Sequence, residues 1–376
     1  MKDMIQAREN DERPKLFKKA HGVLFEHYKE KAQPENISNV NSNHELAMEA
    51  AVHHRWLSGS DFFTWFDEQV EVFSNAHRTN LLFRIYLFLV GALTESNGEE
   101  HPSTLITRSN LAQQIGNQGR YQEAETEFRA IWEIQRRPEV LGEEHPSTLT
   151  TRHDLALQIG NQGRYQEAET EFRAIWEIQR RPEVLGEEHP STLITRSNLA
   201  LQIGHQGRYQ EAETEFRAIW EIERRPEVLG AEHPGTLTTR SNLALQIGNQ
   251  GRYQEAETEF RAIWEIQRRP EVLGEEHPHT LNTRHNLAQQ IGNPGRYQEA
   301  ETEFRAIWKI WRRPEVLGVE HSYVLRVEFL IAKMLDRQGQ EAEADRWLDG
   351  LERRMILQVS QDHKYIIELR AYIKDR

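Results

Sequence analysis

The sequence repeats itself with a period of 44 residues. The period is marked by His101, His145, His189, His233, His277 and His321. Between these histidines the text HPSTLITRSNLAQQIGNQGRYQEAETEFRAIWEIQRRPEVLGEE recurs with few changes. Five full copies cover residues 101–144, 145–188, 189–232, 233–276 and 277–320, and a degenerate sixth copy begins at His321. A period of this length is the signature of an array of small structural units, so it takes precedence over other fold signals.

Each copy predicts two amphipathic helices. Apolar residues recur at helical spacing in two groups, which in the first copy are Leu105, Leu111, Ala112 and Ile115, and then Tyr121, Ala124, Phe128 and Ile131. Between the groups, Gly116, Asn117 and Gly119 tolerate left-handed backbone and predict a tight reversal. Pro138 and Gly142 end the second helix. The next helix opens at His145-Pro146, where we expect Ser147 or Thr148 to cap it.

Neither helix of such a pair can bury its apolar face alone, so the copies must stack on one another. A stack of helical hairpins with a small constant rotation is an α-solenoid, which grows through contacts between neighbouring copies only. The length of 376 residues therefore does not imply several globular domains.

The motifs within one copy resemble a known repeat family. The run N-L-A, then G-R-Y-x-E-A-E, then F, then L-G-x-E-H-P is similar to the tetratricopeptide repeat of the kinesin light chain type. This variety also occurs in many bacterial and fungal proteins, in some of which the array adjoins a STAND-type nucleotide-binding module. The resemblance implies an all-α, right-handed α-solenoid of tetratricopeptide helix pairs with helical caps at both ends. It also implies that the first helices line a concave groove that holds extended peptides or partner helices.

The chain departs from the family pattern at the seam between copies. The light-chain type usually has a period of 42, and here two extra residues fall in the stretch that contains Pro138. Trp132 replaces a small or aliphatic residue, and its regular recurrence is best explained by packing between copies rather than by an aromatic binding stripe. These changes bear on the pitch of the superhelix and leave the fold unchanged.

The segments that flank the five copies predict further helices. Residues 1–14 read as a flexible start, and residues 15–98 as a helical amino-terminal cap with helices near 15–32, 43–57, 61–75 and 79–93. Two degenerate repeat pairs would explain the same segment. Residues 321–376 read as the degenerate sixth unit followed by a capping helix from Lys364 to Lys374.

Composition excludes several classes of function. The chain has no cysteine, so it has no disulfide framework or thiolate metal site, and a reducing cytoplasm is the default compartment. Its net charge of -13 argues against binding to nucleic acid or to anionic membrane surfaces. The longest apolar stretch, Leu81 to Leu93, contains Arg84 and is too short to span a membrane. We expect a cytoplasmic protein that binds neither nucleic acid nor membrane.

The sequence contains no motif for catalysis or for a cofactor. A phosphate-binding loop, a nucleophile elbow, a zinc-protease motif and a dinucleotide fingerprint are all absent. The recurring E-E-H-P element places one histidine per copy, too far from its neighbours to share a metal ion. We therefore expect no enzyme activity, no cofactor and no metal site.

Differences between the copies are confined to one side of the first helix. In the first copy these positions are Ile106, Ser109, Asn110, Gln113 and Asn117, at steps of 3, 1, 3 and 4, which share a helical face. The predicted partner-binding groove comprises Ser109, Asn110, Gln113, Asn117, His153, Asp154, Leu157, Asn161, Arg196, Ser197, Asn198, Leu201, His205, Ser241, Asn242, Leu245, Asn249, His285, Asn286, Gln289 and Asn293. The competing explanation is neutral drift at exposed positions after duplication, although drift should also have marked the second helices.

The residue types in this groove suggest its chemistry. Asparagines are able to bracket a peptide backbone, Leu157, Leu201 and Leu245 form an apolar centre, and His153, His205 and His285 belong to the residue type that titrates between pH 5 and 8. Arg196 and its equivalents either reach the groove, which would suit an acidic partner, or pair with a glutamate of a neighbour. The fifth copy also carries Lys309, Trp311 and Val319, which suggest a patch that docks either the terminal cap or a partner protein.

Two functions fit this sequence. The first is a non-enzymatic scaffold or adaptor that binds a peptide or helix of a partner protein in the groove. The second is a sensory or regulatory arm of a signalling or defence system, STAND-like or protease-linked, which acts on a separate effector through residues 15–95. The oligomeric state does not follow from the sequence.

Overall fold

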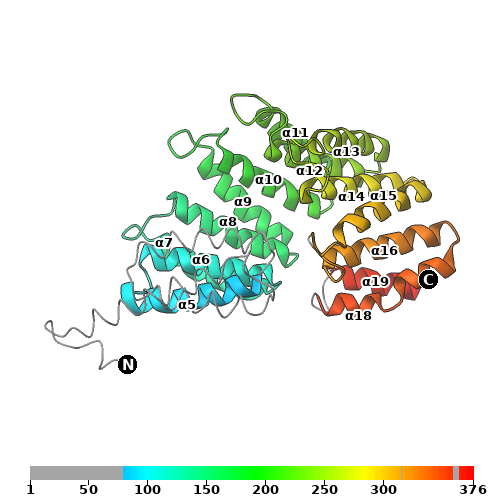
Figure 1. Cartoon of the computed structure of the whole chain (residues 1–376). Coiled ribbons are helices and arrows are strands. Elements are labelled where there is room, and N and C mark those ends of the chain that lie inside the picture. Colours follow the sequence, from blue (N-terminus) through cyan, green and yellow to red (C-terminus); the bar gives the residue numbers. More distant parts are fainter. Residues whose placement is uncertain (1–78, 315, 359–363) are drawn as a thin grey trace, which may run out of the picture. The chain divides into compact units, whose positions relative to one another are not determined.

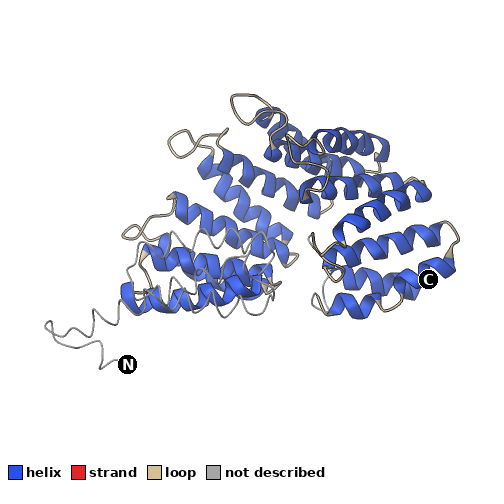
Figure 2. Cartoon of the chain, viewed as in Figure 1, coloured by secondary structure: helices blue, strands red, loops and turns tan. Residues whose placement is uncertain are grey.

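The computed structural model describes residues 79–314, 316–358 and 364–376, and these residues form helices and no strands (Figure 1, Figure 2). The predicted flexible start at 1–14 and the predicted helices near 15–32, 43–57 and 61–75 lie outside the described residues. The chain divides after Val140 into two compact units. None of the described helices is both long and apolar enough to cross a membrane.

The described part of the first unit contains three consecutive helices. They are α5 (Thr79–Asn97), α6 (Pro102–Asn117) and α7 (Tyr121–Gln135). Helix α5 packs on α6, and α6 packs on α7. The first copy of the repeat therefore supplies α6 and α7, and the predicted helix near 79–93 lies within α5.

The second unit contains the remaining copies. Its helices are α8 (Pro146–Asn161), α9 (Tyr165–Gln179), α10 (Pro190–His205), α11 (Tyr209–Glu223), α12 (Pro234–Asn249), α13 (Tyr253–Gln267), α14 (Pro278–Gly292), α15 (Tyr297–Trp311), α16 (Ser322–Arg337), α17 (Glu341–Leu348), α18 (Leu351–Ile356) and α19 (Lys364–Asp375). Equivalent first helices begin 44 residues apart, at Pro146, Pro190, Pro234 and Pro278. Each helix packs on the next along the chain from α8 to α17, which confirms the predicted stack of helical pairs (Figure 1).

The apolar positions predicted from the spacing form the core of this stack. One cluster joins Leu193 and Phe216 of the third copy to Leu243, Ile247 and Ala256 of the fourth. Side chains of two consecutive copies therefore share one core, as a solenoid requires. The broken second helix of the sixth copy, α17 and α18, turns at Gly350, whose φ of 67° is left-handed. Behind it, α18 and α19 share a small core with α16. The assignment of residues 15–98 and 321–376 as caps stays a prediction.

The helix starts differ from prediction in one respect. The N-cap of each first helix is the recurring histidine, whose Nδ1 accepts the backbone N–H two residues later. In α10, Ser191 N lies 3.1 Å from His189 Nδ1. The serine and threonine predicted as caps do not serve this purpose, since Thr192 is buried and its hydroxyl points to Gln179 O of the preceding copy.

The two glycines of each inter-helix turn also have different roles. Gly207, with φ of 81°, makes the predicted left-handed turn between α10 and α11. Gly204 instead lies inside α10, where a Cβ atom would stand 2.6 Å from Gln246 Oε1 of the next copy. Gly160 and Gly248 face Gln202 and Gln290 in the same way. Glycine is required there because neighbouring first helices approach closely, which the sequence did not reveal.

Candidate partner-binding surface

The positions that differ between copies form a continuous surface on the first helices of the second unit. We call this surface the first-helix face. It consists of Asp154, Asn198, Asn242 and Asn286, then Leu157, Leu201, Leu245 and Gln289, and finally Asn161, His205, Asn249 and Asn293. The first two groups are half-buried and the third is exposed, while the invariant positions beside them, such as Leu199, Ala200 and Ile203, are buried. Helices α8, α10, α12 and α14 contact one another in sequence, so the face runs across copies.

The first unit carries the equivalent residues of the first copy on α6. Asn110 and Asn117 are exposed there, and Gln113 donates its amide to Asn117 Oδ1 at 3.2 Å. Ser109 is half-buried and donates to Leu105 O at 3.1 Å, within its own helix. Ser109 therefore turns back toward the backbone rather than outward.

The histidines His153 and His285 are the clearest correction to the predicted groove. Their rings lie between helices, edge-on to Phe172 and Phe304 of their own copies, with centroids 5.1 and 5.5 Å apart. Burial lowers the pKa of His153 to about 4, and burial together with the charge of Arg326 lowers the pKa of His285 to about 4. The prediction that they change charge between pH 5 and 8 is therefore wrong.

The other residues predicted beside these histidines are Ser197, Ser241 and His205. The hydroxyl of Ser241 is buried without a hydrogen-bond partner, and Ser197 is half-buried. His205 is different, because it is exposed at the end of α10 and stacks on Tyr165 with ring centroids 5.0 Å apart.

The recurring arginine of the first helix has a structural role. Arg196 Nε lies 2.8 Å from Glu215 Oε2, its guanidinium lies over the Trp176 ring at 5.4 Å, and its side chain is only 13% exposed. Arg152, Arg240 and Arg284 make the same ion pair with Glu171, Glu259 and Glu303. The glutamate belongs to the same copy and not to a neighbour, as one alternative had it. Arg196 consequently does not offer its charge to the first-helix face.

The recurring tryptophan completes this arrangement. The Trp176 ring contacts two guanidinium groups, those of Arg180, the C-cap residue of α9, and of Arg196 in the next copy, at 4.9 and 5.4 Å from its centroid. The cation–π contact with Arg196 joins two consecutive copies. Packing between copies, the favoured interpretation of the tryptophans, agrees with this geometry.

Asp154 is the single acidic residue of the first-helix face. It occupies the position that is asparagine in the third, fourth and fifth copies. Burial disfavours its charged form and raises the pKa of its carboxyl to about 6. A carboxyl with a pKa near 6 is still mostly ionised at pH 7, so Asp154 carries the one negative charge of a face made otherwise of side-chain amides, His205 and three half-buried leucines.

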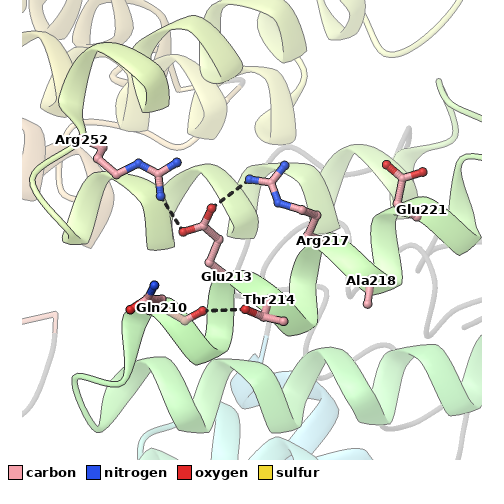
Figure 3. Close-up of a pocket in the computed structure, with 7 residues that line it drawn as sticks. All are labelled: Gln210, Glu213, Thr214, Arg217, Ala218, Glu221 and Arg252. Carbon is pink, nitrogen blue, oxygen red and sulfur yellow. Dashed lines mark hydrogen bonds and ion pairs between the residues drawn. The ribbon is translucent and has the colours of Figure 1, made fainter.

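The second helices carry open hollows that the sequence did not point to. One is lined by Gln210, Glu213, Thr214, Arg217, Ala218, Glu221 and Arg252 (Figure 3). At its floor, Glu213 accepts hydrogen bonds from Arg217 at 2.8 Å and from Arg252 and Gln250 of the next copy at 2.7 Å. Burial opposes the ionisation of Glu213, but these hydrogen bonds outweigh it and hold the pKa of this carboxyl below its ordinary value. Glu213, Arg217 and Arg252 of this hollow thus satisfy one another.

The same ion pairs recur along the second helices. Arg208 binds Glu169 of the preceding copy, and Arg296 binds Glu257, both at 2.7 Å. The signal that would have found this ladder is the invariance of an arginine before each second helix and of a glutamate one turn into it. These residues join copies to one another, so the second-helix side is a structural surface.

The predicted docking patch of the fifth copy is partly internal. Trp311 is 6% exposed and lies against His285 and Tyr323, so it packs inside the stack. Lys309 and Val319 are exposed. Within the described residues, no group of three or more His, Asp or Glu side chains is arranged to hold a metal ion.

Comparison with known proteins agrees with this architecture. The family model for the tetratricopeptide repeat matches residues 148–191 and 236–279. The chain is similar to a crystal structure from Podosopora anserina described as a putative kinesin light chain with nearly identical TPR-like repeats, at 31% identity over 57% of this chain and 97% of that chain, with a TM-score of 0.46. No curated protein matches the chain.

Two more distant structures share the fold. The apo form of RapI is 14% identical and covers 82% of this chain and 97% of its own length, with a TM-score of 0.54. A tetratricopeptide repeat protein from Parabacteroides merdae is 14% identical and covers 80% and 94%, with a TM-score of 0.51.

Proposed function

The chain belongs to the tetratricopeptide repeat proteins of the kinesin light chain type, and from this premise we propose that it is a non-enzymatic scaffold that binds a peptide or helix of a partner protein on its first-helix face. Repeats of this family serve protein–protein interaction in general. The observation that carries the proposal is the state of Asn242 and Asn286. Both side-chain amides have no hydrogen-bond partner among the described residues, and both lie beside the half-buried Leu245 or Gln289.

The chemistry of the first-helix face suits a peptide main chain. A side-chain amide offers donors and an acceptor, which match the N–H and C=O groups of an extended segment. The half-buried leucines would accept an apolar side chain of the same segment and remove it from water. Because these groups are already surface-accessible, no rearrangement of the array is needed for them to bind.

The state of the arginines argues against an acidic partner, which would need arginines that are free to bind it. Arg196 and its equivalents are paired with glutamates and covered by tryptophans, so they leave no positive charge for a ligand carboxylate. We therefore propose a neutral peptide segment with apolar side chains.

The second-helix side is a suitable control surface for a binding experiment. Arg208, Arg252 and Arg296 on this side are paired with Glu169, Glu213 and Glu257, so a ligand that used these arginines would have to displace ion pairs already made. The alternative function, a regulatory arm, depends on residues 15–95, of which only 79–95 are described. It stays a prediction.

The test is a pull-down from native cell lysate with the full chain and two matched triple variants. One replaces Asn242, Leu245 and Asn286 by alanine, and the other replaces Gln210, Gln254 and Gln298, which are exposed on the second helices. We expect a protein that is retained by the wild type and by the glutamine variant but lost with the first-helix variant. Circular dichroism of all three proteins checks that helicity is equal. Equal retention by both variants would contradict the proposal.

A further inference from the structure

The three asparagines at one register of the first-helix face, Asn198, Asn242 and Asn286, are not equivalent. Asn198 Nδ2 lies 3.0 Å from Nε2 of His153, which belongs to the preceding copy. The other ring nitrogen, His153 Nδ1, lies 3.2 Å from Thr195 Oγ1. The imidazole thus bridges two residues of α10 from its own position on α8, and Phe172 covers its edge.

The bridge fixes the tautomer of the ring. With the Asn198 amide nitrogen as donor, His153 Nε2 must accept and its proton must lie on Nδ1, which then donates to Thr195 Oγ1. Burial holds the pKa of His153 at about 4, so the ring stays neutral and keeps its acceptor throughout the neutral range. Asn198 is therefore engaged whenever the protein is near pH 7.

The next two junctions lack this bridge. The residue that corresponds to His153 is Ser197 in the third copy and Ser241 in the fourth. A serine hydroxyl is several ångströms shorter than an imidazole, and neither serine bonds the asparagine that follows it in the next copy. In the part of the chain that is described, Asn242 and Asn286 have no side-chain hydrogen-bond partner, and the Ser241 hydroxyl is buried without one.

We infer that His153 is a positioning residue that engages the side-chain amide of Asn198 and thereby confines peptide binding at the register of Asn198, Asn242 and Asn286 to Asn242 and Asn286. This inference rests on the proposed function and names the part of the face that does the binding. Neighbouring first helices are roughly 10 Å apart, so the two free amides would bracket about three residues of an extended chain. The ligand that fits is a short, extended, neutral segment.

A library of random dodecapeptides displayed on phage, selected against the full chain, supplies the probe. The affinity of selected peptides is then measured by fluorescence anisotropy. We expect Asn242→Ala and Asn286→Ala each to weaken binding about tenfold, the loss typical of one buried hydrogen-bonded group. Asn198→Ala, the matched variant, should change affinity less than about twofold, because its amide is already used within the protein.

Exchanging residues between copies tests the role of His153 directly. Ser241→His places an imidazole where it can engage Asn286 and should weaken peptide binding about tenfold. In a His153→Ser background Asn198 is released, so Asn198→Ala should now weaken binding. A merely structural histidine would alter melting without this transfer of dependence from one asparagine to another.

A nitrogen-15 NMR spectrum of the histidine rings reports on the bridge without any ligand, and it also covers the case in which an exchange variant fails to fold. We expect His153 to be neutral at pH 6 with its proton on Nδ1. A ring protonated on Nε2, or an Asn198→Ala effect as large as that of Asn286→Ala, would overturn the inference while leaving the proposed function intact. Peptides that bind without regard to any first-helix residue would contradict the proposed function itself.

Discussion

Replacement of His153 by serine should reduce the acid sensitivity of the fold. The ordinary pKa of histidine is 6.5, and burial lowers that of His153 to about 4 in the folded state. On acidification the unfolded chain takes up a proton near pH 6.5 and the folded chain does not, so the unfolded state is favoured. The stability contributed by the neutral ring is therefore present above pH 6.5 and is lost as the pH falls toward 4.

The magnitude follows from the size of the shift. A displacement of about 2.5 pH units corresponds to roughly 3 kcal/mol at most. Between pH 7 and pH 5, where the unfolded histidine titrates almost fully and the buried one hardly at all, the loss is about 2 kcal/mol. Serine is a native residue at this register, in Ser197 and Ser241, so His153→Ser is compatible with the backbone of the array.

Urea unfolding followed by circular dichroism at pH 7 and pH 5 measures this loss. The wild type and His153→Ser share every other titrating group, so those contributions cancel in the difference between the two proteins. We expect the variant to lose about 2 kcal/mol less than the wild type over this interval. Ser197→Ala, at the same register one copy later, should keep the pH dependence of the wild type. An equal loss in wild type and His153→Ser would show that the ring is solvated and would refute the reasoning.

Two further predictions concern the stability of the array. His189→Ala should lower the free energy of unfolding by about 1 kcal/mol because the backbone amide of Ser191 loses its cap, whereas His189→Asn should keep most of the wild-type stability. The urea midpoints of both variants measure this difference, and equal midpoints would contradict the capping role. Gly204→Ala should lower the stability of the array by about 1 to 3 kcal/mol because the new methyl group would collide with Gln246. At a helical glycine with open space around it, the same substitution stabilises the helix by about 1 kcal/mol. Gly91→Ala, in a helix with open space around the glycine, is the control, and stabilisation by both changes would show that the approach at Gly204 is not tight.

The helix boundaries and the core could be predicted from local features of the sequence. The helix boundaries follow from Pro190, which opens α10, and from Gly207, which ends the turn after it, because these residues restrict the backbone wherever they occur. The core follows from the spacing of residues such as Leu193 and Phe216, since helical periodicity selects one face. Because the copies are nearly identical, each such inference held for every copy at once.

The errors concerned residues whose surroundings come from another helix. His153 lies one position from Asp154 on the helical face, and periodicity alone cannot tell a side chain that faces solvent from one that enters the seam beside it. Whether Arg196 reached a ligand or a glutamate depended on Glu215, which lies 19 residues later on a different helix. The cap at His189 was missed because serine and threonine are the more frequent caps and both occur within three residues after it.

The structure also explains why the second helices hardly differ between copies. Glu213 binds Arg217 of its own helix and Arg252 of the next copy, so a change in one copy would leave a buried charge without its partner in another. Invariance there has a structural cause, and it does not by itself distinguish drift from selection on the first helices. That choice depends on residues of the first-helix side that have no structural partner.

Two positions of the first helix allow drift and selection to be compared. Ile194, Thr238 and Asn282 are exposed equivalents and differ from copy to copy, as drift predicts. Asn242 and Asn286, four residues later on the same helices, remain asparagine although no described residue bonds their side-chain amides. Packing does not require an amide at that register, because Asp154 occupies it in the second copy. An unpartnered amide beside a position that varies is available to a ligand, which is the binding that we propose at Asn242 and Asn286.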